Sequence, residues 1–273
     1  MSRSTATIGA DGATMAEQSS PPPLPAVRRL EAVAFRAWPA AESQYDGSWL
    51  IRLTRGHTSR RLNSINPLDP FDSADLEGRL ERASRRFRET GLPPTLRQTP
   101  LTPPPLIAHL DSGGWSRFAE SIVMTVDIPA HETGDTVEHL PLRDLQRFVE
   151  ARLAVSGEPQ SSAPALLSIL EAIKAECGLF LFEERGFGPT AVAMAVHDND
   201  LLGINQVAVH GARRRAGIGS ALLTACLRWG RLKGARQAWL AVEAANAPAR
   251  ALYESLGFRE VYRYLYRQPE GRP

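Results

Sequence analysis

Apolar residues recur along this chain at spacings that predict helices and strands. Leu76, Leu80, Ala83 and Phe87 follow a helical period with charged residues between them, which predicts a helix over 74–89 that Gly91 ends. Similar patterns predict helices over 30–38, 106–110, 165–176, 217–230 and 248–256, and one that begins near Leu142. Runs bounded by turn sequences predict strands over 49–54, 61–65, 117–126, 138–140, 179–183, 190–197, 201–209, 237–242 and 259–266.

The order of these elements predicts the fold class. Three successive strands over 179–209 are separated by Arg185–Gly188 and Asp198–Asp200, which are good turn sequences and indicate an antiparallel meander. A helix (217–230), a strand (237–242), a second helix (248–256) and a last strand (259–266) are expected to follow the meander. We therefore expect an α/β (α+β) protein with a mixed, mostly antiparallel sheet flanked by helices, preceded by a smaller α/β domain.

The expected division into domains rests on composition. Residues 1–24 are rich in Ser, Thr, Ala, Gly and Pro, which predicts a disordered tail. Residues 129–134 contain a proline, a glycine and no apolar periodicity, so a linker is expected over 128–135. The predicted domains are an N-terminal α/β domain over 25–127 and a second domain over 136–268, with a short tail over 269–273.

Composition and charge exclude several classes of protein. With 43% hydrophobic residues, the 273 residues can bury a substantial core, and the formal net charge of +2 comes from 32 basic and 30 acidic residues of alternating sign. No basic domain for nucleic acid is therefore expected. No apolar run is long enough for a membrane span or a secretory core, which predicts a cytoplasmic protein without a membrane partner. Cys177 and Cys226 lack metal-ligand spacing, so we interpret both as reduced core residues and expect no metal.

The most informative stretch joins the strand over 204–209 to Arg214-x-x-Gly217-x-Gly219. Glycines between a strand and a helix let successive N–H groups and the positive end of the helix converge on an anion, and a pyrophosphate suits this arrangement. Taken alone, the motif also fits an ordinary turn. The dinucleotide-binding fingerprint requires a third glycine, whereas residue 222 is a leucine.

A second block runs from Val242 to Phe258. Asn246 is a good helix N-cap with Pro248 in the first turn, and Gly257 suits the residue that follows the helix. Tyr253 lies on this helix.

Together the two blocks and the meander resemble the GNAT (Gcn5-related) N-acetyltransferases over about residues 136–268. The resemblance implies acetyl-CoA as acetyl donor. The loop that would wrap its pyrophosphate comprises Arg214, Arg215, Ala216, Gly217, Ile218, Gly219 and Ser220, and the strand that would pair with its pantetheine arm comprises Gln206, Val207, Ala208 and Val209. In the family the residue matching Asn246 hydrogen-bonds the cofactor. The residue matching Tyr253 is the general acid for the leaving thiolate, beside the thioester sulfur.

The resemblance implies direct transfer of acetyl to a primary amine in a ternary complex. The acceptor, either a small-molecule amine or a peptide or protein amine, is not readable from the sequence, and a homodimer stays open. Family members often carry a carboxylate on the strand matching 201–209, where this chain has none; Asn205, Gln206 and His210 stand there, and the base is left unassigned. A non-catalytic acyl-CoA-binding or regulatory module is the alternative, and a transferase of longer acyl groups is a third reading.

The first half lacks any equivalent of the glycine motif. Its order of helix, hairpin, helix, strand, helix and strand fits a degenerate second GNAT-like fold, as in tandem family members, and an unrelated α/β cap is the alternative. We interpret its hairpin over 49–66, with Arg52, His57, Arg60, Arg61 and Asn63, as a solvated polar hairpin.

Overall fold

The computed structural model describes residues 22–130 and 139–270. Most of the predicted N-terminal tail (1–21), of the linker (131–135) and of the C-terminal tail (271–273) lies outside the described residues. The helices in the described part are α1 (Leu24–Ala37), α2 (Leu76–Glu89), α3 (Pro104–Ser112), α4 (Leu145–Ser156), α5 (Ala163–Ala172), α6 (Ile218–Leu232) and α7 (Ala247–Ser255). None of the described helices has the length and apolar character needed to cross a membrane.

The strands form one sheet of ten strands in the order β1-β2-β3-β4-β10-β5-β9-β8-β7-β6. In chain order the strands are β1 (Glu42–Asp46), β2 (Trp49–Leu53), β3 (Ser64–Pro67), β4 (Leu96–Gln98), β5 (Trp115–Asp127), β6 (Glu176–Glu184), β7 (Gly188–Asp198), β8 (Leu201–Val209), β9 (Gln237–Glu243) and β10 (Arg259–Pro269). The expected mixed, mostly antiparallel sheet flanked by helices is confirmed.

The same order of elements occurs twice along the chain. The first half runs β1-β2-β3-α2-β4-α3-β5, and the second runs β6-β7-β8-α6-β9-α7-β10. In both halves the first three strands pair antiparallel, and the third and fourth pair in parallel across a helix. The topology of the first half therefore repeats that of the second.

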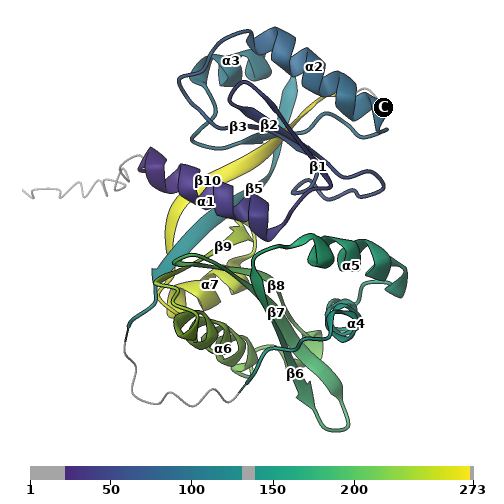
Figure 1. The fold of residues 1–273 in the computed structure, drawn as a ribbon, viewed down its shortest axis with the longest axis vertical. Coiled ribbons are helices and arrows are strands. Elements are labelled where there is room, and N and C mark those ends of the chain that lie inside the picture. The colour runs from purple at the N-terminus through teal and green to yellow at the C-terminus, as the bar shows by residue number, and fades with distance from the viewer. Residues whose placement is uncertain (1–21, 131–138, 271–273) are drawn as a thin grey trace, which may run out of the picture.

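The two halves exchange their last strands. Leu96–Gln98 of β4 pairs with β10 of the second half, and β9 pairs with Ser121–Asp127 of β5 from the first half. β5 and β10 also pair with each other along most of their length and run from one half into the other (Figure 1). The strands on either side of the expected linker thus share one sheet, and the domain boundaries themselves stay a prediction.

Three apolar clusters fill the space between the sheet and the helices. In the second half, α6 and α7 pack against one face of the sheet, to which β9 contributes Leu240 and Val242. Helices α4 and α5 pack against the opposite face, together with α1. In the first half, α2 and α3 pack against β2, β3 and β4, with Trp49 and Phe87 fully buried. Side chains alternate between the two faces of a strand, so β6, β7, β8 and β9 each contribute to both layers.

A buried charged group joins both halves to α1. Arg97 on β4 donates two hydrogen bonds to the Glu31 carboxylate on α1, at 2.9 Å from Nε and 2.7 Å from Nη2. The Tyr262 hydroxyl of β10 donates to the same carboxylate at 2.5 Å. Glu31 is 1% exposed, and these three donors supply the partners that a buried carboxylate needs.

The interpretation of the first hairpin as solvated is wrong for two of its residues, because Arg52 and Asn63 are buried. Arg52 donates to the backbone carbonyls of Arg61 (2.6 Å) and Trp38. Asn63 accepts from Thr54 N–H at 2.7 Å and donates to a carbonyl of the 57–59 loop. These side chains satisfy the backbone groups of the irregular loop between β2 and β3.

One predicted strand is also wrong. His139 and Leu140 are not part of a strand, and Glu138 lies outside the described residues. The chain pairs with β6 a little later, through a single bridge between Leu142 and Leu179.

Candidate functional site

A gap in the sheet opens between β8 and β9. The two strands pair in parallel where Leu201–Gly203 meets Gln237–Trp239, and no pair in the described residues joins the rest of β8 to β9. Gln206, Val207, Ala208 and Val209, the residues predicted to pair with the pantetheine arm, lie on this part of β8 and are half-buried. Their backbone groups on the β9 side are therefore available to an extended ligand that offers amide groups of its own.

A β-bulge lies within the same segment. Met194 of β7 pairs with Asn205 and Val192 pairs with Ala208, so one residue of β7 faces two residues of β8. Gln206 adopts a left-handed backbone with φ 53°, and its side chain accepts a hydrogen bond from Arg152 Nε of α4 at 2.8 Å. The bulge bends β8 beside the gap.

The chain then forms a loop whose N–H groups converge before α6. Arg215 and Gly217 both have left-handed backbones, with φ 60° and 77°. The first intrahelical donor is Ala221, whose N–H bonds to Gly217 O at 3.0 Å. The N–H groups of Ile218, Gly219 and Ser220 precede it and point out of the helix end, as an anion requires.

Gly219 brings the loop against the second motif. A Cβ atom at this position would lie 3.0 Å from Leu252 Cδ2 of α7 and 3.6 Å from Val209 Cγ2 of β8. Even the Cβ of an alanine would require the Leu252 side chain to shift, and a larger side chain would require more. The two sequence blocks therefore meet in space, and the end of β8 lies beside them.

The arginines of the loop have different surroundings. Arg213 forms an ion pair with Glu184 at 2.7 Å and lies 3.9 Å from the Phe187 ring centroid, so it is held by the β6–β7 turn. Arg214 and Arg215 are exposed and form no ion pair within residues 22–130 and 139–270. Ala216 between them and the glycine is also exposed. Arg214 donates through Nε to the carbonyl of Val209 at 3.4 Å, and the charges of Arg214 and Arg215 are not neutralised by a carboxylate of the described residues.

Helix α7 begins and ends as the sequence predicts. Asn246 accepts from Ala249 N–H at 3.2 Å and caps the helix, and Gly257 follows it with φ 89°. Tyr253 on α7 is 7% exposed, and its ring lies 6.0 Å from that of Phe258 in a T-shaped contact. Burial raises the pKa of Tyr253 to about 12, so its hydroxyl keeps its proton at neutral pH.

The side chain of His210, a candidate base from the sequence, is held by contacts at the end of β8. Its Nδ1 accepts from Ala212 N–H at 3.3 Å, and its ring makes a T-shaped contact with Phe187 at 4.9 Å between centroids. The imidazole therefore caps the turn Gly211–Arg213 at the end of the strand.

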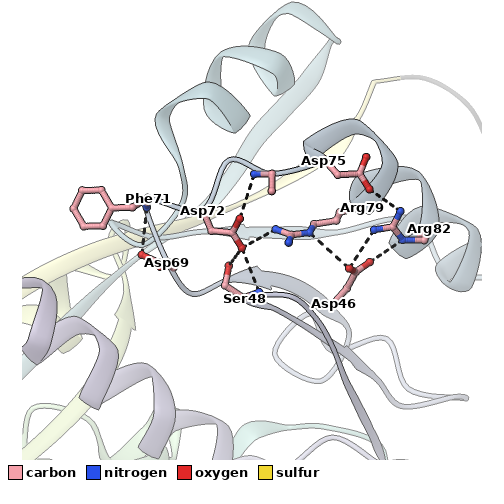
Figure 2. Close-up of polar contacts among 9 residues, drawn as sticks. Asp46, Ser48, Asp69, Phe71, Asp72, Asp75, Arg79 and Arg82 are labelled. Atoms are coloured by element: carbon pink, nitrogen blue, oxygen red, sulfur yellow. Dashed lines mark hydrogen bonds and ion pairs between the residues drawn. The ribbon is translucent and has the colours of Figure 1, made fainter.

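The corresponding loop of the first half contains carboxylates of its own. Between β3 and α2, the Asp72 carboxylate accepts from Ser48 Oγ and from Arg79 Nη1, each at 2.7 Å, and from Ala74 N–H at 3.2 Å (Figure 2). These donors hold the pKa of Asp72 far below its usual range. An internal carboxylate thus accepts from one backbone N–H group of this loop, that of Ala74.

The sequence analysis missed one acidic residue beside the gap. Glu243 ends β9 and lines a cavity of about 350 Å³ together with Ser121, Tyr264 and residues of the 58–61 loop. The strand over 201–209 carries no carboxylate, whereas β9 ends in one. The predicted strand over 237–242 ends one residue before Glu243, and only the order of the strands in the sheet brings this residue to the site.

Solved structures share this fold across both halves. A GCN5-related N-acetyltransferase from Kribbella flavida superposes with a TM-score of 0.64 at 17% identity, covering 90% of this chain and 95% of that chain. A tandem GNAT protein from the clavulanic acid biosynthesis pathway superposes with a TM-score of 0.58 at 15% identity, covering 94% of this chain and 91% of that chain. These likenesses show that the chain has the fold of GNAT proteins, including a tandem one.

Among GNAT proteins, the chain belongs to the family described as "Probable histone acetyltransferase Rv0428c C-terminal", which it matches over residues 25–267. The match includes both halves of the sheet, so the family likeness extends well beyond the region that carried the sequence resemblance. A relative from Escherichia coli strain K12, named "[Ribosomal protein bS18]-alanine N-acetyltransferase", is 43% identical over 68 residues. That alignment spans 24% of this chain and 46% of the relative.

Proposed function

We propose that the protein is an acetyl-CoA-dependent N-acetyltransferase that transfers acetyl to a primary amine by direct transfer in a ternary complex. The observation that carries the proposal is the combination of an unpaired β8 edge with the converging N–H groups at the start of α6. One site pairs with an extended amide chain and the other binds an anion, and coenzyme A contains both features in one molecule.

The residues along the open edge of β8 and the following loop would bind successive parts of acetyl-CoA. The pantetheine arm would pair with the main chain of Gln206, Val207, Ala208 and Val209. The pyrophosphate would be held by the N–H groups of the loop over 214–220, with Arg214 and Arg215 adding charge. Asn246, which is exposed at the start of α7, would add a polar contact.

Tyr253 is the proposed general acid. A thiolate leaving in a site without bulk water needs a proton, and a neutral phenol supplies one. The backbone N–H of Val207 or Val209 would donate to the carbonyl oxygen while charge develops there. Direct attack of a neutral amine on the thioester needs neither a metal nor a covalent enzyme intermediate. Cys226 is buried and burial raises the pKa of the Cys177 thiol to about 12, so neither thiol suits a nucleophile.

Transfer to nitrogen is supported by the relative from Escherichia coli, which is named for acetylating an alanine. Because the alignment covers less than half of that relative, its acceptor is not carried over to this protein. The competing proposal is a non-catalytic acyl-CoA-binding module, favoured by the lack of any carboxylate on β8.

Calorimetric titration with acetyl-CoA, followed by thiol release against a panel of amines, tests the proposal. We expect binding that Gly219→Val weakens strongly, because the added side chain pushes α6 away from Leu252. We expect Tyr253→Phe to bind acetyl-CoA normally and to release thiol about 100-fold more slowly. Absence of binding would contradict the proposal, and binding without thiol release on any amine would favour the module.

A further inference from the structure

The cavity beside Glu243 lies on the opposite side of the sheet from Tyr253. Glu243 pairs with Ser121 across β9 and β5, and Ser121 pairs with Tyr264 across β5 and β10, so the three side chains lie in one row on one face. That face is the one that α1 and α4 cover, whereas Tyr253 packs with the residues under α6 and α7. Glu243 lies on β9 beyond the last pair with β8, Gly203 with Trp239, at the part of the sheet where these two strands are unpaired.

The outer wall of the cavity comes from the first half of the chain. The loop between β2 and β3 contributes Thr58, Ser59, Arg60 and Arg61. Arg60 lies over the rings of Phe118 and Tyr266, 5.3 and 5.5 Å from their centroids. Arg61 lies 4.7 Å from the Trp38 centroid. Aromatic contacts thus hold both guanidinium groups in place at the cavity.

The charged groups of this cavity form no ion pairs among the described residues. Across residues 22–130 and 139–270, neither Arg60 nor Arg61 forms an ion pair with a carboxylate, and Glu243 forms none with a basic residue. Burial lowers the pKa of Arg61, as expected for a guanidinium in a desolvated position. A guanidinium in such a position is stabilised by an incoming anion that forms a bidentate contact.

A buried amide adds a free donor in the same region. Asn205 on β8 is 7% exposed, and its Nδ2 atom has no hydrogen-bond partner among the described residues. Its Oδ1 atom lies 3.5 Å from Arg61 Nη1. Asn205 lines a small cavity that shares Arg61, Ala241, Tyr264 and Tyr266 with the cavity beside Glu243. A buried donor without an acceptor is costly, and a ligand oxygen at this place satisfies it.

We propose that this cavity is the acceptor site and that it selects a small amine carrying a carboxylate, such as a free amino acid, with Arg60 and Arg61 binding the carboxylate and Glu243 facing the amine. The inference rests on the proposed acetyl transfer. Lysine side chains and peptide N-termini bring the amine without the nearby carboxylate, and they leave Arg61 and Asn205 unsatisfied. The volume of about 350 Å³ suits a small molecule.

The proton balance gives Glu243 a catalytic role. Glu243 takes one proton from the ammonium group, and the neutral nitrogen forms the C–N bond while the C–S bond breaks. Tyr253 gives its proton to the sulfur, and the second proton that leaves the nitrogen replaces it. The proton on Glu243 passes to solvent through the exposed end of β9. The products are an N-acetyl amino acid and the free thiol.

The test compares the twenty standard amino acids with their carboxamides as acceptors, using thiol release from acetyl-CoA. The carboxamide keeps the amine and loses the negative charge. We expect at least one amino acid to be acetylated with a kcat/KM roughly 100-fold above that of its carboxamide. Arg60→Met and Arg61→Met each reduce the ratio of kcat/KM for the amino acid to kcat/KM for its carboxamide at least about tenfold, because they raise KM for the amino acid. Glu243→Gln lowers kcat for the amino acid while KM changes little.

Arg55→Met is the matched control. Arg55 belongs to the same hairpin, lies 3.6 Å from Glu42 and is outside the cavity, so the ratio should stay unchanged. Arg60 is exposed, so its variant keeps the test valid even if Arg61→Met fails to fold. Equal rates for acids and carboxamides, or acetyl-CoA binding with no amino acid acetylated, overturns this inference alone. Failure to bind acetyl-CoA overturns the proposed function and this inference with it.

Discussion

At the scale of single residues, Gly217 determines the shape of the loop before α6. Its φ of 77° lies in the left-handed region, where a Cβ atom costs about 1 kcal/mol. We expect Gly217→Ala to reduce the free energy of unfolding by about this amount and to weaken acetyl-CoA binding at least about fivefold, as calorimetry would measure. Gly186→Ala in the β6–β7 turn, with φ 81°, carries the same strain and should leave binding unchanged. Equal losses of affinity in both variants would contradict a role for the loop.

Tyr253 gives the protein a specific dependence of stability on pH. The pKa of this phenol is raised from 10 to about 12 by burial. The contribution of Tyr253 to the free energy of unfolding is therefore complete below pH 10, the pKa of the phenol in the unfolded chain. It is lost as the pH rises towards about 12, the pKa in the folded protein. The full shift corresponds to up to about 3 kcal/mol. Urea denaturation from pH 9 to 12 should show a steeper loss of stability in the parent protein than in Tyr253→Phe. Tyr45→Phe, at an exposed tyrosine, is the control, and parallel profiles for the parent and Tyr253→Phe would contradict the expectation.

Residues with a local role were predictable from the sequence, whereas residues with a role across strands were not. Asn246 caps α7 through the N–H of Ala249, three residues later, and Gly257 lies just after the helix, so both roles follow from neighbouring positions. The left-handed conformation of Gln206 depends on pairing with β7 and on Arg152 of α4. The site role assigned to Glu243 depends on the order of β8, β9 and β5, which no short motif encodes.

At the scale of elements, α1 is attached to the sheet by the buried Glu31 carboxylate. Its partners Arg97 and Tyr262 come from β4 and β10. Glu31→Gln leaves a buried guanidinium without a counter-charge, so we expect a loss of about 3 kcal/mol in the free energy of unfolding, measured in urea. Arg28→Gln, which removes an exposed pair with Asp69, should cost less than about 1 kcal/mol. Similar small losses for both variants would contradict the stabilising role of the buried group.

Elements were predictable where their pattern was strong. The helix over 74–89 and the meander over 179–209 agree with α2 and with β6, β7 and β8. The start of α1 was missed because Pro25 obscured it, although proline is tolerated in a first helical turn. β1 was missed because its residues are polar and mostly exposed, as edge strands often are.

At the scale of the whole molecule, the exchanged strands make the second half dependent on the first. A chain that begins at residue 136 lacks β5, which lies between β9 and β10. We expect this fragment to show no cooperative thermal unfolding and to aggregate, because both strands then expose unpaired edges. Appending residues 115–127 after β10 through a short glycine-serine linker should restore a cooperative transition. A fragment that unfolds cooperatively without β5 would contradict this dependence.

The exchange also constrains the order of events during synthesis. β4 is made early, yet its partner on one side is Leu265–Arg267, near the end of β10. A nascent chain therefore carries an open strand edge until almost all of the sequence has been translated, and contacts of such long sequence separation form slowly. The first half can complete its part of the sheet only after β10 has been translated. Between the synthesis of β4 and that of β10, the open strand edge is the feature that a chaperone would need to protect.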